Sequence, residues 1–173
     1  PRYGICDKPF LFYSGNQWLE AGSQQNLRSD VERGGTLIAF RNYPRKDETF
    51  RPCSILGFEE PHSTLFEFKR AFSVKLGPDR PKVDINSSVF CFDITRGQSV
   101  QADLGSYGKA TIGYIRKIGR GRIVHLGFEP NSAIIIELLG LLKIPTASYA
   151  ATPGGKTGFF KRGRRCFLIA VNN

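Results

Sequence analysis

The chain has 173 residues, of which 40% are hydrophobic and 12% aromatic, enough to bury the core of one domain. Charged residues make up 23%, and no apolar run reaches about 18 residues, which argues against a membrane-spanning helix and against wholesale disorder. The net charge of +10 would attract phosphate-rich or otherwise acidic partners.

The two ends of the chain suggest that it is a piece of something longer. It opens at Pro1, contains no methionine, and shows no charged segment followed by the apolar segment of a secretory signal. We therefore expect an excised part of a larger protein. The compartment stays open, with the cytoplasm favoured because no secretory signal is visible.

The first forty residues predict a strand, a helix and a second strand. The apolar run 10–13 ends at Ser14, a polar stretch follows as far as Gly34-Gly35, and 36–40 is apolar again. Ser14 and Gln17 have capping-box spacing, and the glycine pair is typical of a helix C-terminus. Such a βαβ unit implies parallel strands joined by a right-handed crossover.

The middle of the chain changes texture. Residues 42–51 are polar and indicate a surface excursion, whereas 65–113 hold short aromatic-rich runs that predict a β-rich insertion or antiparallel extension. Residues 110–118 and 122–128 predict a hairpin whose second strand is apolar enough to be central. A helix with a polar cap and a broad apolar surface follows Ser132.

The apolar pattern stops after Pro145 and returns in the strand-like run 166–171. We therefore expect an α/β domain over 1–145, a three-layer sandwich with a mostly parallel sheet and a β-rich insertion. Residues 146–173 are expected to be a linker and the first strand of a following β domain, because so short a tail cannot bury a core alone.

Cofactor and metal sites are not indicated. The four cysteines, which lie far apart and form no CxxC pair, are best interpreted as free structural thiols: Cys6, Cys53, Cys91 and Cys166. His125 lies within an apolar strand and His62 in a loop, and neither has a neighbouring base or ligand in the sequence. We predict neither a cofactor nor a metal.

Catalytic groups are equally hard to find, and no catalytic residue is predicted. Ser14 stands between a strand and a helix, as a nucleophile elbow would, but it lacks the small flanking residues of that motif and reads better as a cap. The neighbouring acids Glu59-Glu60 and Asp47-Glu48 do not have the arrangement of a glycosidase acid and base. Trp18 could stack on a sugar or pack at an interface.

Two basic clusters could contact an anionic partner. One comprises Lys161, Arg162, Arg164 and Arg165, and the other Arg116, Lys117, Arg120 and Arg122. Both fall in hairpin-like sequence, where such side chains commonly solvate turns and protect sheet edges. Nucleic acid is disfavoured, because no recognition helix or aromatic RNA-binding motif accompanies the charge.

Three blocks together resemble the middle domain of bacterial β-galactosidases, a domain similar in fold to class I glutamine amidotransferases. They are QQNLRSDVERGGTLIAF, NYPRKDETFRPCSIL and KIGRGRIVHLGFEP with the helix that follows. The resemblance covers roughly residues 8–144, and it implies a flavodoxin-like fold. The closing CFLIAVNN looks like the opening strand of the β domain that follows in those enzymes.

That resemblance implies a non-catalytic, oligomer-building domain of a glycoside hydrolase that cleaves terminal β-galactosides. The implied partners are the parent chain's own catalytic barrel and β domain, and further copies of the chain; no membrane is implied. Two alternatives stay open. One is a stand-alone hydrolase or amidotransferase relative using Ser14 or a cysteine, and the other is a basic adaptor for an anionic partner.

Overall fold

The computed structural model describes residues 10–13, 15–65, 72–143, 156–162 and 165–171, the last two ranges for their backbone alone. The chain divides into two compact units, which are considered separately. The first comprises residues 1–75 and 82–130, and the second residues 76–81 and 131–173.

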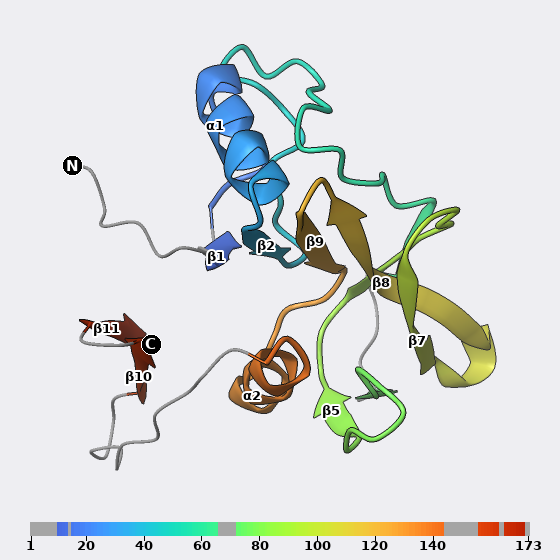
Figure 1. Cartoon of the computed structure of the whole chain (residues 1–173). Coiled ribbons are helices and arrows are strands. Elements are labelled where there is room, and N and C mark those ends of the chain that lie inside the picture. The colour runs from blue at the N-terminus through green and yellow to red at the C-terminus, as the bar shows by residue number, and fades with distance from the viewer. Residues whose placement is uncertain (1–9, 14, 66–71, 144–155, 163–164, 172–173) are drawn as a thin grey trace. The chain divides into compact units, whose positions relative to one another are not determined.

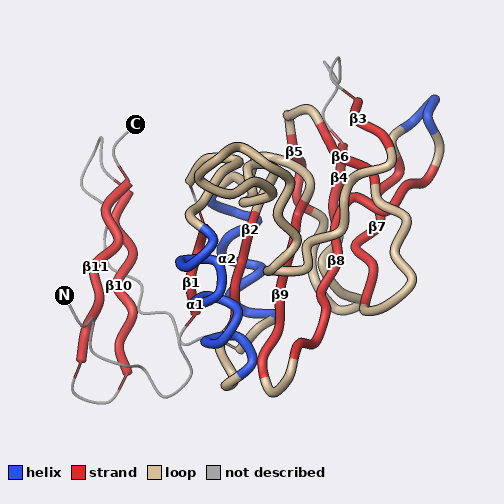
Figure 2. The backbone as a smooth tube through the Cα atoms, turned by 90° about the horizontal axis from the view of Figure 1, so that it is seen from above, coloured by secondary structure: helices blue, strands red, loops and turns tan. Residues whose placement is uncertain are grey.

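The first unit is built on a seven-stranded sheet with the order β1-β2-β9-β8-β7-β4-β5 (Figures 1 and 2). Its strands are β1 (Phe10–Tyr13), β2 (Thr36–Ala39), β4 (Phe72–Val74), β5 (Val83–Ile85), β7 (Gln98–Asp103), β8 (Lys109–Ile118) and β9 (Gly121–Leu126). A second, two-stranded sheet pairs β3 (Ser63–Leu65) with β6 (Val89–Cys91). One turn of 3-10 helix, η1 (Gly105–Tyr107), connects β7 to β8.

Three neighbouring strands of the large sheet run parallel, as the βαβ pattern predicts. β1 pairs with β2 in parallel, with Phe10 opposite Thr36, and β2 pairs in parallel with β9. Helix α1 (Ala21–Glu32) connects β1 to β2 and packs against β2 and β9. The predicted strand, crossover helix and strand are therefore confirmed.

The rest of the sheet is antiparallel, so the expected flavodoxin-like fold is wrong. β9 pairs antiparallel with β8, and the same holds for β8 with β7, β7 with β4 and β4 with β5. The described residues contain only two α-helices, so the chain is mostly β with a mixed sheet. A three-layer sandwich around a mostly parallel sheet does not describe it.

The physical reason for this difference lies in the connections. Parallel strands need a crossover of a dozen or more residues, usually a helix, whereas antiparallel strands can follow one another through short turns. Between β2 and β9 the described residues contain no second crossover helix, and β8 turns directly into β9. Strands β4, β5, β7 and β8 therefore extend the large sheet itself, whereas β6 pairs with β3 in the second sheet.

Helix α1 ends as predicted but begins later than predicted. Gly34 has φ +121° and donates to the Val31 carbonyl, while the Gly35 amide reaches the Asp30 carbonyl, which is the Schellman pattern. The helix begins at Ala21, so Ser14 and Gln17 do not form its capping box. Instead Glu48 Oε2 accepts a hydrogen bond from the Ala21 amide at 2.8 Å. Its negative charge suits a helix N-terminus.

The predicted hairpin between β8 and β9 is also present, and its second strand is central. Ile118 lies opposite Gly121, and Gly119 has φ +57° in the turn between them. A Cβ on Gly121 would overlap the Val31 and Gly35 carbonyl oxygens, so only glycine allows α1 to approach this turn so closely. β9 lies between β2 and β8, with every residue from 123 to 126 fully buried.

The second unit contains helix α2 (Ser132–Leu141) and the antiparallel pair β10 (Lys156–Arg162) and β11 (Arg165–Val171). Asn131 caps α2 by accepting a hydrogen bond from the Ile134 amide at 2.9 Å, which confirms the polar cap. The strand expected at 166–171 is part of β11. Neither described helix is long and apolar enough to cross a membrane. The domain boundary near Pro145 remains a prediction.

Candidate functional site at the carboxyl ends of the parallel strands

The parallel strands β1, β2 and β9 all end at the same edge of the sheet, at Tyr13, Ala39 and Leu126. In sheets with parallel strands joined by crossovers, ligands bind outside these carboxyl ends. Much of this edge is formed by the loop 40–62 that follows β2. Figure 1 shows this teal loop beside the first turn of α1. The side chains on this edge are therefore the first place to look for chemistry.

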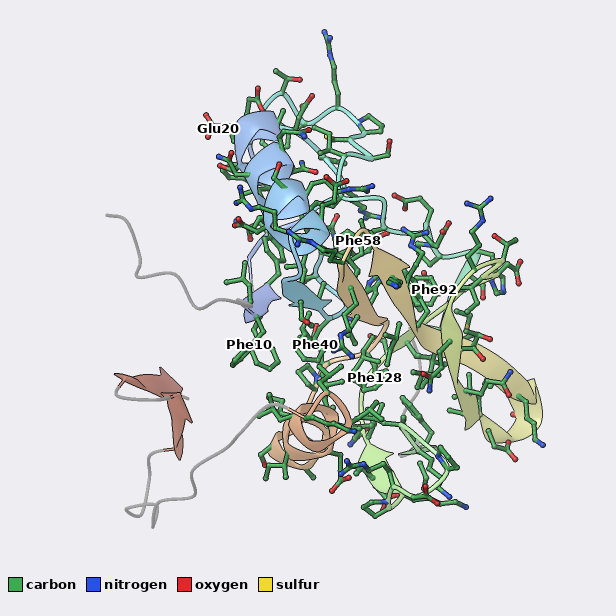
Figure 3. The ribbon with its side chains drawn as sticks, in the orientation of Figure 1. Phe10, Glu20, Phe40, Phe58, Phe92 and Phe128 are labelled. Carbon is green, nitrogen blue, oxygen red and sulfur yellow. The ribbon has the colours of Figure 1, made fainter. Side chains whose placement is uncertain are left out.

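His125 lies at the centre of a buried aromatic cluster below this loop. Its ring centroid is 4.4 Å from Tyr43, 4.9 Å from Phe92, 5.0 Å from Phe58 and 5.4 Å from Tyr114. Figure 3 labels two of these neighbours, Phe58 and Phe92. The histidine is completely buried, and its Nδ1 lies 3.3 Å from the Tyr114 hydroxyl. It is the core histidine that the apolar strand predicts.

The electrostatics of the cluster keep it uncharged. Burial lowers the pKa of His125 to about 3, although a backbone hydrogen bond with Phe40 opposes that shift. Burial also raises the pKa of Tyr114, and burial together with Glu60 raises the pKa of Tyr43. An imidazole that stays neutral and sealed from solvent is a poor proton shuttle near neutral pH. The cluster is therefore suited to holding the loop 40–62 against the sheet by aromatic packing.

The adjacent acids Glu59 and Glu60 anchor the same loop. Glu59 forms an ion pair with Arg116, and its amide donates to the Tyr114 hydroxyl at 2.8 Å. Glu60 accepts a hydrogen bond from the Tyr43 hydroxyl at 3.1 Å and lies 3.7 Å from Arg45. Both carboxylates have partners within the chain and hold the loop in place. This agrees with the sequence analysis, in which the two acids do not have the arrangement of a catalytic pair.

Trp18 forms an exposed pair with Phe50 on the outside of this edge. The side chains are 43% and 63% exposed, and their ring centroids lie 6.0 Å apart at an interplanar angle of 58°. The Trp18 segment pairs with the loop after β2, since the amides of Arg45 and Lys46 both donate to the Gln17 carbonyl. The structure therefore places Trp18 on a surface.

The turn that presents Phe50 is held by Asp47. Its Oδ1 accepts hydrogen bonds from the Thr49 amide, the Thr49 hydroxyl and the Arg51 amide at 2.7–3.0 Å. These bonds, with that of the Thr49 side chain first, lower the pKa of Asp47. Phe50 itself has φ +62°, a left-handed conformation that bulky residues rarely adopt. The turn thus holds an aromatic side chain in an unfavourable backbone conformation.

Those remaining sequence candidates that the structure describes are not brought together. Ser14 and Cys6 lie outside the described residues. Cys53 is a half-buried free thiol, and Cys91 is a buried one. His62 has Asp93 3.6 Å from its Nδ1. In the part of the chain that the structure describes, no three metal-ligating side chains form a cluster.

The first predicted basic cluster is described only in part, whereas the second lies wholly within the described residues. Arg162 and Arg165 are opposite each other at the end of the β10–β11 hairpin, and Arg164 lies outside the described residues. Arg116 is occupied by Glu59. A separate shallow depression of about 550 Å³ carries three lysines: Lys75, Lys82 and Lys109. The anionic-partner alternative stays a prediction.

The sequence did not predict most of the side chains that surround His125 and Trp18. Tyr43, Phe58 and Phe92 are far from His125 in the sequence and offer no common spacing. Phe50 was missed as the partner of Trp18 for the same reason. Tyr114 could have been found, because the predicted hairpin places it opposite His125. The other local signal is the Asp-x-Thr sequence at 47–49, which is typical of a side-chain-stabilised turn.

Comparison with known proteins gives both a family match and a fold. Residues 5–86, a little under half of the chain, match the family model described as GLMA-like, second domain. No curated protein matches the sequence. Among solved structures the chain is similar to three β-galactosidases, each over a large part of this chain and a small part of the enzyme.

The first is from Bacillus circulans sp. alkalophilus, with 11% identity, a TM-score of 0.66, and coverage of 95% of this chain and 27% of that one. The β-galactosidase of Rahnella sp. R3 has 13% identity, a TM-score of 0.66, and coverage of 96% and 28%. A catalytic mutant of a GH42 β-galactosidase from G. stearothermophilus has 14% identity, a TM-score of 0.64, and coverage of 94% and 26%.

At such low identities it is the TM-scores of 0.64–0.66 that show a shared fold, and the chain spans roughly a quarter of the length of those enzymes. The resemblance inferred from the sequence blocks is confirmed at this level. Residues 5–86 thus match the model of a GLMA-like second domain, and the chain has the fold of a region of β-galactosidases.

Proposed function

We propose that this chain is a non-catalytic domain of a multidomain glycoside hydrolase similar to β-galactosidase. The observation that carries the proposal is the coverage of the structural match. Nearly the whole chain, 95%, is matched, but only 27% of the first enzyme is used. The match to a GLMA-like second domain supports the same interpretation. Hydrolysis of terminal β-galactosides would then belong to another part of the parent protein.

The chemistry of the described site supports a structural role. Retaining and inverting glycosidases use two carboxyl groups on either side of the scissile bond, one of them able to give up a proton. Here Glu59 and Glu60 are engaged by Arg116, Tyr43 and Arg45. Adjacent residues that both anchor one loop do not form the two sides of a sugar site.

The finer part of the proposal is that this domain helps to assemble subunits of the parent enzyme. An apolar depression of about 250 Å³ lies between β1 and α1, lined by residues that include Leu11, Leu27, Val31 and Leu37. Leu11 is 43% exposed on β1, the last strand at its end of the large sheet. Exposed apolar surface of this kind is typical of contacts between protein chains, and a second copy of the chain is the proposed occupant.

The catalytic half of the proposal is tested by assaying hydrolysis of an aryl β-galactoside. The isolated chain and the product of the complete open reading frame are compared at equal concentration. We expect hydrolysis by the complete product and none by the isolated chain. Hydrolysis by the isolated chain would overturn the non-catalytic assignment, and an inactive complete product would overturn the galactosidase assignment.

The assembly half is tested by sedimentation velocity. The isolated chain is measured over a hundredfold range of concentration, beside the variant Leu11→Asp, which places a charge in the apolar depression. We expect reversible self-association that this variant weakens. A strict monomer throughout the range would contradict the assembly role, whereas Leu11→Asp leaving association unchanged would move the contact elsewhere on the domain.

A further inference from the structure

We propose that Trp18 and Phe50 form a surface platform that binds a neutral saccharide chain, separate from any catalytic centre. The choice of a saccharide rests on the proposed function, because a glycoside hydrolase domain meets such chains. The geometry of the platform is independent of that function. It is defined by two touching aromatic rings, a strained turn and a balanced rim of charges.

The first observation is that two large aromatic side chains remain exposed where they touch each other. Trp18 is 43% exposed and Phe50 63%, and their rings lie 6.0 Å apart at 58°. Packing the two rings together has therefore not removed them from water. The exposed parts of the two rings form an apolar surface on which a ligand can stack.

The second observation is the backbone conformation of Phe50. A φ of +62° costs a non-glycine residue roughly 1–2 kcal/mol, which would be avoided by glycine at this position. The Asp47 hydrogen bonds, together with a hydrogen bond of 3.0 Å from the Phe50 amide to the Asp47 carbonyl, hold the residue there. Strained residues of this kind gather at ligand-binding positions.

The third observation is how firmly the platform is attached to the sheet edge. Glu48, inside the same turn, accepts a hydrogen bond from the first amide of α1. The Leu19 amide, next to Trp18, donates to the Lys46 carbonyl at 2.9 Å, and Gln24 Nε2 binds that same carbonyl. Both rings thus stand on ordered backbone at the carboxyl ends of β1 and β2, so little freedom is lost on binding.

The chemistry of the rim favours a neutral, hydroxyl-rich ligand. Within the turn, Lys46 and Arg51 are offset by Asp47 and Glu48 in the sequence, and the preceding Arg45 is paired with Glu60, so the turn carries little net charge. A pyranose ring has an apolar C–H face for stacking and a rim of hydroxyls for such polar neighbours. A charged ligand would gain little from a rim in which both signs of charge are present.

Tryptophan fluorescence gives a direct test, because Trp18 is the single tryptophan of the chain. The isolated chain is titrated with a neutral β-1,4-linked galacto-oligosaccharide while its tryptophan emission is followed. Because the platform is open, we expect a saturable change with a dissociation constant on the order of 1 mM.

Three variants give this titration its specificity. Phe50→Ala removes one ring and should weaken binding about tenfold or more. Phe50→Tyr keeps the ring and should retain binding, which separates loss of the ring from disturbance of the turn. Tyr107→Ala is the matched control, because Tyr107 is also 63% exposed but belongs to η1. It should titrate like the unmodified chain.

Two results would overturn the platform. One is the absence of any emission change up to tens of millimolar saccharide. The other is an emission change that depends on protein concentration alone and disappears in Phe50→Ala, which would make the pair a contact between copies. Neither result bears on aryl β-galactoside hydrolysis by the complete product, so failure of the platform and failure of the proposed function are distinguishable.

Discussion

His125 shows how burial decides what a titratable residue can do. A histidine in a sheet near the carboxyl ends of parallel strands would suggest acid–base chemistry, but this ring is enclosed by four aromatic side chains and has a pKa of about 3. In the unfolded chain the same group titrates near 6.5. Between about pH 3 and 6.5 the unfolded chain therefore binds a proton at His125 that the folded chain does not bind.

This difference predicts the pH dependence of stability. Above about pH 6.5 His125 is neutral in both states and adds no pH dependence to the free energy of unfolding. As the pH falls from there toward 3, that free energy should decrease by about 1.4 kcal/mol per pH unit. Urea unfolding at several pH values measures this slope. The variant His125→Leu should lose that part of the slope, whereas His62→Gln should keep it because His62 lies in a loop near solvent. Identical slopes in both variants would contradict the burial argument.

The backbone conformation of Phe50 gives a second prediction. Glycine at position 50 removes the left-handed strain, and the lost ring is 63% exposed, so Phe50→Gly should stabilise the fold by about 1 kcal/mol. Phe50→Ala loses the ring but keeps most of the strain, and should not stabilise. Urea unfolding followed by circular dichroism distinguishes them. Equal destabilisation by both variants would show that the ring contributes more than its conformation costs.

Helix α1 shows which helix ends can be predicted from neighbouring residues in the sequence. Its glycine stop at residues 34 and 35 follows from sequence alone, because a left-handed residue followed by a strand is a short-range requirement. Its start does not, because the capping carboxylate comes from Glu48, 27 residues beyond Ala21. The spacing of Ser14 and Gln17 therefore predicts the wrong N-terminus for α1. A sequence pattern locates a helix end only where neighbouring residues form the cap.

The glycine stop gives a paired prediction for α1. Gly34→Ala places a side chain at φ +121° and should destabilise the protein by more than about 1 kcal/mol. Gly22→Ala, in the first turn of the same helix and with free space around its Cβ, should be neutral or stabilising by up to about 1 kcal/mol. Thermal unfolding of both variants tests this, and a similar loss in each would contradict the Schellman assignment.

At the scale of the whole molecule, the sequence predicted the pieces better than their arrangement. The βαβ unit, the β8–β9 hairpin and the capped helix α2 were each predicted from runs of adjacent residues. The sheet as a whole was mistaken for a mostly parallel one, because a βαβ start favours further crossovers and nothing local states how β7, β4 and β5 continue it. Most of the aromatic cluster around His125 could not be predicted either, since Tyr43, Phe58 and Phe92 meet it only after folding; Tyr114, opposite His125 in the predicted hairpin, is the exception.

The central claim is that this domain supports an enzyme without supplying its catalytic groups. The most direct measurement is kcat for aryl β-galactoside hydrolysis by the complete gene product carrying Ser14→Ala or Glu60→Gln, with sedimentation checking that its assembly is unchanged. The proposal predicts kcat within about twofold of the unmodified enzyme. A fall of roughly 10³-fold or more in a normally assembled variant would contradict it, because a loss of that size is typical of removing a catalytic nucleophile or acid.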